Sequence, residues 1–186
     1  MKNLSIYTLI FTVCLSFAAC SSDDDSTPEI VNEEEVITTV SLTLTPPAPG
    51  TVVILRSFDA DGDGPTAPVV TVSGNLEANT TYTAAILFLN ETETPSENIT
   101  EEVQEEAEEH QVFYTIGSSL EATITYVDFD VNAHPLGTSI TLTTANTSQD
   151  ILTVTLRHEP KKPNDGTLID AGGETDVQVS FPVVIN

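Results

Sequence analysis

Apolar and polar residues alternate with a period of two over most of the chain beyond residue 35. In segment 40–44, Val, Leu and Leu occupy every second position, with Ser and Thr between them. This period places the apolar side chains on one face of an extended strand. The run 84–89 is continuously apolar, which predicts a strand buried on both faces. The expected strands are 40–44, 51–58, 69–73, 80–89, 111–116, 120–129, 137–143, 151–158 and 175–185.

Residues 95–109 break the period of two. Pro95 follows Thr94, and Glu97 lies three residues after Thr94, a spacing typical of a capping box with proline at the first helical position. Apolar residues then recur at four-residue spacing among glutamates, at Ile99, Val103 and Ala107. The pattern predicts one short acidic helix.

About eight or nine strands with one short helix predict an all-β fold, an antiparallel β-sandwich of the immunoglobulin-like kind. A jelly roll or a small barrel is the alternative architecture. The chain has 186 residues, enough for one domain with a sizeable core.

The first twenty residues have the pattern of an export signal. Lys2 is followed by an apolar run that is too short to span a membrane as a helix. An ordinary secretory signal is one interpretation. The end of the run, Phe17-Ala18-Ala19-Cys20, resembles the lipobox of bacterial lipoproteins, with Phe17 in the place usually held by leucine. That resemblance implies a signal peptide over 1–19 and palmitate or similar acyl chains on Cys20. The acidic composition that follows predicts a flexible tether over 20–35, and the strand pattern predicts a sandwich domain over 36–186.

The segment after Cys20 carries two further resemblances. Ser21-Ser22-Asp23-Asp24-Asp25 resembles the acidic signal that sends lipoproteins of the Bacteroidetes to the outer face of the outer membrane. Asp25-Ser26-Thr27 resembles the O-glycosylation sequon of that phylum, which implies Ser26 as the modified residue. The other cysteine, Cys14, lies in the leader, so no disulfide is expected in the exported domain.

The charge of the chain limits its partners. Its formal net charge is −24, and Arg56, Arg157, Lys161 and Lys162 are the cations beyond the leader. Such a surface argues against nucleic acid, which proteins bind by neutralising phosphates. The sequence has no nucleophile elbow, phosphate loop or metalloprotease helix. We therefore expect a protein that is not an enzyme.

The most specific local motif is an acidic loop. Asp59, Asp61 and Asp63 alternate with small residues, and Gly64 follows them. Three carboxylates at this spacing match the first half of a calcium loop. Val70 stands where an EF-hand needs glutamate, so we expect either a different calcium site or an acidic turn.

Histidines and glutamates supply a second candidate site. Glu106 and His110 lie four residues apart on the expected helix face, and His134 and His158 are the other histidines. Imidazole and carboxylate ligands suit transition metals. A solvated acidic face with structural histidines is the alternative.

Segments 58–65, 99–114, 156–161 and 171–177 resemble recurring sequence segments of a group of small Bacteroidetes lipoproteins. Proteins of this group carry the label "type 1 periplasmic binding fold superfamily protein". The strand pattern predicts a sandwich rather than the two α/β lobes that this label names. The resemblance implies association with a TonB-dependent outer-membrane receptor.

Together these observations predict a surface lipoprotein of the outer membrane. It would act as a non-enzymatic binding or accessory module, with a metal or metal complex as the candidate ligand. The alternative is a structural or adhesive domain of immunoglobulin-like type that calcium stabilises.

Overall fold

The computed structural model describes residues 35–62 and 64–186. Residues 34–186 belong to one compact unit. The leader, Cys20, Ser26 and Asp63 lie outside the described residues. The strands are β1 Thr39–Thr45, β2 Val53–Phe58, β3 Val69–Val72, β4 Thr81–Leu89, β5 His110–Ile116, β6 Ala122–Tyr126, β7 Ser139–Thr144, β8 Ser148–His158 and β9 Glu174–Ile185, and the helices are α1 Ile99–Glu105 and α2 Leu168–Ala171.

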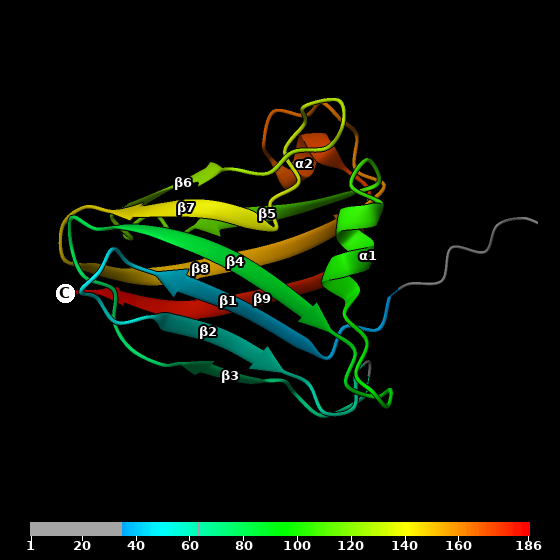
Figure 1. The fold of residues 1–186 in the computed structure, drawn as a ribbon, viewed down its shortest axis with the longest axis horizontal. Coiled ribbons are helices and arrows are strands. Elements are labelled where there is room, and N and C mark those ends of the chain that lie inside the picture. Colours follow the sequence, from blue (N-terminus) through cyan, green and yellow to red (C-terminus); the bar gives the residue numbers. More distant parts are fainter. Residues whose placement is uncertain (1–34, 63) are drawn as a thin grey trace, which may run out of the picture. The chain divides into compact units, whose positions relative to one another are not determined.

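The strands form two antiparallel sheets, which confirms the predicted all-β sandwich. The larger sheet has the order β3-β2-β1-β4-β7-β6, and the smaller one has the order β5-β8-β9. Figure 1 shows the two sheets as layers, with α1 beside the end of the sandwich where β8 ends and β9 begins. Among the described residues, no helix has the length and apolar character needed to cross a membrane.

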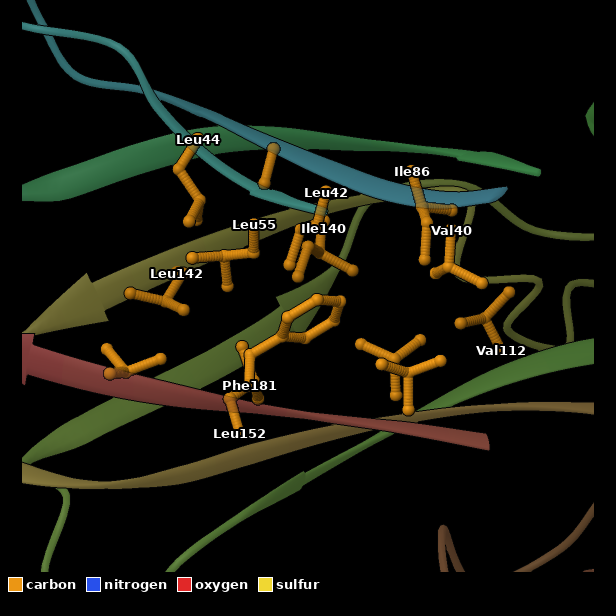
Figure 2. Packing of buried hydrophobic residues seen from close by; sticks show 14 of the residues in the cluster. Val40, Leu42, Leu44, Leu55, Ile86, Val112, Ile140, Leu142, Leu152 and Phe181 are labelled. Atoms are coloured by element: carbon orange, nitrogen blue, oxygen red, sulfur yellow. The ribbon is translucent and has the colours of Figure 1, made fainter. Parts of the chain in front are cut away.

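The core fills the space between the two sheets. Phe181 of β9 and Leu152 of β8 face residues of the larger sheet such as Leu42, Leu55 and Ile140, as Figure 2 shows. Each of these five side chains is at most 1% exposed. Two-residue alternation in the sequence thus becomes one continuous apolar layer.

Strand β4 corrects the prediction of burial on both faces. Ala84, Ile86 and Phe88 are buried, whereas Ala85 is exposed and Leu87 is 38% exposed. The larger sheet is covered on its inner face, so the apolar run alternates like the other strands.

Helix α1 begins later than the capping-box spacing predicts. Asn90 and Glu97 exchange two backbone hydrogen bonds, which holds Glu97 extended. The helix therefore starts at Ile99, with Asn98 at the N-cap position. Ile99 and Val103 are buried against the sandwich. Helix α2, which the sequence did not predict, spans only four residues.

Candidate metal centre

Two histidines lie opposite each other at one end of the smaller sheet. His110 is the first residue of β5 and His158 the last of β8, and the two are register partners. Val112 and Leu156, each two residues further into the sheet, belong to the core. Because side chains two apart share a face of a strand, both histidines point to the inner side of the sandwich. His110 is fully buried, His158 is 6% exposed, and their ring centroids lie 4.5 Å apart.

Asp176 joins the histidines through a β-bulge. The register between β8 and β9 shifts after Leu156, so that Leu156 pairs with Val177 and Arg157 pairs with Thr175. Asp176 is the extra residue, and a bulge re-aims the side chain at which it occurs. One ligand atom from each of His110, His158 and Asp176 lies within 4.8 Å of the others.

Two glutamates approach His110 from outside the sheet. Glu35, just before β1, places Oε1 3.4 Å from Nε2 of His110. Glu106, at the end of α1, places its carboxylate 3.9 Å from Nδ1, and its backbone oxygen lies 3.3 Å from the same nitrogen. Glu35, Glu106 and His110 form a second group with metal-ligand spacing, and Glu109, His158 and Glu159 form a third.

The two ring nitrogens of His110 have different surroundings. A proton on Nδ1 can be donated to the backbone oxygen of Glu106, which leaves the lone pair on Nε2. Nε2 is buried, and Oε1 of Glu35, 3.4 Å away, is its charged neighbour. Oε2 of Glu35 has no hydrogen-bond partner within the described part of the chain. Metal-binding histidines typically anchor one nitrogen on a backbone oxygen in this way and offer the other to the ion.

The site has a strongly negative field. Burial alone would lower the pKa of His110, but the carboxylates of Glu35 and Asp176 outweigh burial and raise it. Burial and the neighbouring Glu35 and Glu106 also raise the pKa of Glu102. The raised pKa of His110 reflects the carboxylates beside it, whose negative charge a bound cation would neutralise.

The side chains present suit a transition metal. Two imidazoles with one or two carboxylates match zinc, whose ligand atoms lie about 2.0–2.2 Å from the ion. Tetrahedral ligands at that distance are ~3.3 Å apart, so atoms within 4.8 Å of one another need only small side-chain rotations. His110, His158 and Asp176 are the candidate ligands, and Glu35 belongs to a neighbouring group that shares only His110 with them.

His134 belongs to none of the three groups with metal-ligand spacing that the described residues form. Its Nδ1 lies 3.3 Å from Oδ2 of Asp130, which also pairs with Nζ of Lys162 at 3.3 Å. Lys162 further donates to the backbone oxygen of Ala107. His134 therefore takes part in a separate cluster of charged residues.

The acidic loop is only partly described. Oδ1 of Asp59 accepts the backbone N–H of Asp61, and Oδ2 of Asp61 accepts that of Thr66. Neither aspartate belongs to a group with metal-ligand spacing among the described residues, and Asp63 lies outside them. Calcium binding stays a prediction, which thermal melting with calcium and with chelator would test.

Glu35 and Asp176 are the site residues that sequence reasoning missed. Glu35 closes an acidic run that resembles a tether, and its contact with His110 is long-range. Asp176 lies in a strand where only the bulge turns it toward the histidines. The spacing of Glu106 and His110 was the one local signal of the site.

Comparisons with known proteins identify no relative. No family model matches the chain, and no curated protein or solved structure is significantly similar to it.

Proposed function

We propose that this protein is a non-enzymatic module that binds a divalent transition metal at the end of its β-sandwich. The observation that carries the proposal is the convergence of His110, His158 and Asp176, whose ligand atoms lie within 4.8 Å of one another with both imidazoles buried.

The proposed location is the outer membrane. The lipobox-like end of the leader supports acylation of Cys20, and the acidic residues after it support a position on the cell exterior. Since each buried methylene contributes about 0.8 kcal/mol, two or three acyl chains would hold the domain permanently at the surface. Delivery of the metal, or of a metal complex, to a TonB-dependent receptor completes the proposal.

Isothermal titration calorimetry with zinc tests metal binding. The protein spanning residues 21–186 contains the whole compact unit that begins at residue 34. We expect one zinc ion per chain, and a loss of affinity of tenfold or more, about 1.4 kcal/mol, in the His158→Gln variant. Copper(II) and iron(II) titrations would show which ion the site prefers.

The matched control is His134→Gln, which removes a histidine outside the site. Its zinc affinity is expected to equal that of the unaltered protein. Absence of saturable binding of all three metals, or an equal loss in the His134 and His158 variants, would refute a metal site at His110 and His158.

A further inference from the structure

A cavity lies between the two sheets next to the candidate metal centre. It has a volume of about 210 Å³, is partly open to solvent, and is lined by residues before and in the start of β1, at the end of β2, in the loop after β2 and at the start of β9. Pockets for drug-sized ligands measure about 300–1,000 Å³. This one therefore has room only for a small molecule.

Three carboxylates line the cavity, from Glu35, Asp59 and Asp176. The Glu35 side chain is 10% exposed, and its Oε2 has no hydrogen-bond partner within the described residues. A buried carboxylate oxygen of this kind needs a donor or a cation. Arg56, Lys161 and Lys162 are paired elsewhere, with Glu91, Asp170 and Asp130. Arg157 donates to the backbone oxygen of Gly173, and His110 faces the other oxygen of Glu35, Oε1.

No two of the three carboxylates belong to one group with metal-ligand spacing in the described part of the chain, so the arrangement differs from a metal cage. Val40, Val177 and Val179 add apolar side chains to the lining. An alkyl chain would contact such a wall, while its charged ends reached carboxylates.

We propose that this cavity binds a short aliphatic amine, with its ammonium groups at Glu35 and Asp59 and its methylenes against the valines. The cavity meets the metal centre at Asp176 but extends beyond it, because Asp59 lines the cavity without belonging to a metal group, and His110 and His158 do not line it.

The two sites share Asp176, and Glu35 of the cavity contacts the metal-centre residue His110. On the proposed metal function, an ion at Asp176 would neutralise charge that attracts the amine, and the two cations would repel each other. Metal and amine should therefore bind antagonistically, each weakening the other by the same factor.

Amine binding can be measured by calorimetry and by amide NMR shifts on the metal-free protein of residues 21–186. Putrescine is the probe, and butanediol is its uncharged counterpart. We expect saturable binding of putrescine with shifts at Val40 and Val179, and neither for butanediol. Asp59→Asn should lower the affinity for putrescine by about fivefold and leave the affinity for zinc unchanged. The loop should keep its conformation, since asparagine still accepts the N–H of Asp61.

Glu77→Gln is the matched control, because Glu77 is exposed and follows Leu76, which pairs with Ile185 at the far end of β9. It removes one negative charge without touching the cavity. Equal weakening of putrescine by Asp59→Asn and Glu77→Gln would reveal mere counter-ion attraction and overturn the proposal, as would binding of butanediol with equal affinity. Putrescine binding without any zinc binding would uphold the amine site and refute the metal function instead.

Discussion

His110 and His158 are directly opposed across the β5–β8 pair, with ring centroids 4.5 Å apart and planes inclined by 33°. Both occupy positions that continue the core rows of their strands. An apolar pair would satisfy packing at such positions, whereas two imidazoles bring polar nitrogens into a buried place. Carboxylates from β9, from α1 and from the chain before β1 surround them, which is the environment that a cation requires.

Zinc should raise the thermal stability of the protein through these two histidines. A ligand at a hundred times its dissociation constant adds about 2.7 kcal/mol, which shifts the melting temperature of a domain of this size by about 5–10 °C. The shift should disappear in His158→Gln and remain in His134→Gln, as measured by circular dichroism. A zinc shift that persists in the His158 variant would place the metal elsewhere.

The pair of Asp130 and Lys162 should stabilise the segment after β6. Their side chains are 1% and 6% exposed, and Oδ1 of Asp130 also accepts the N–H groups of Asn132 and His134. Asp130→Asn keeps the Oδ1 acceptor but removes the negative charge opposite the buried ammonium, which still donates to the backbone oxygen of Ala107. We therefore expect the free energy of unfolding in urea to fall by about 1.5–3 kcal/mol. Lys162→Met should lower the free energy of unfolding by less than Asp130→Asn does. The double variant should be more stable than Asp130→Asn alone, because it no longer buries an ammonium without its counter-charge.

The same pair predicts a dependence on pH. Burial tends to raise the pKa of Asp130, but the N–H groups of His134 and Asn132 and the Lys162 ammonium outweigh it and lower the pKa below 3.8. A carboxyl with a lowered folded-state pKa stabilises the fold above its ordinary value, and this contribution is lost as the pH falls through the folded pKa. Acid unfolding should therefore begin at higher pH in Lys162→Met, and an unchanged acid midpoint would contradict the pairing.

Local pattern predicted the strands, because each needs only a period of two within one segment. Residues 40–44 and 151–158 illustrate this, since both became strands with one buried face. The predicted start of α1 was wrong because Asn90 and Glu97 form backbone hydrogen bonds across a loop, and local capping signals do not encode such a pairing. Tertiary hydrogen bonds overrode the helix-start signal there.

The site was less predictable than the fold because it depends on register. Sequence analysis named His110 and His158 as candidates, but their meeting requires β5 and β8 to pair with these two residues opposed. Asp176 enters only through a bulge against β8, and Glu35 only through the path of the chain before β1. Each contact joins residues far apart in the sequence.

Thr100 should anchor α1 to β4 through a buried hydroxyl. Its Oγ1 accepts the N–H of Phe88 at 2.7 Å and lies 3.3 Å from the oxygen of the same residue. Thr100→Val preserves the shape but leaves both backbone groups unsatisfied, which should reduce the free energy of unfolding by about 1–3 kcal/mol. Thr100→Ser keeps the hydroxyl and serves as the control. Urea unfolding distinguishes them, and equal losses would point to packing rather than hydrogen bonding.

The anchor and the metal site should be separable. If Cys20 carries the acyl chains, Cys20→Ala should abolish palmitate incorporation and release the protein from the membrane. Zinc affinity and melting temperature should not change, because residue 20 precedes the compact unit that starts at residue 34. Cys14→Ala is the matched control, since that cysteine lies within the expected signal peptide and should leave labelling intact. Palmitate labelling of cells, followed by membrane fractionation, measures both outcomes. Labelling that survives Cys20→Ala would contradict the lipoprotein proposal without bearing on the proposed metal site.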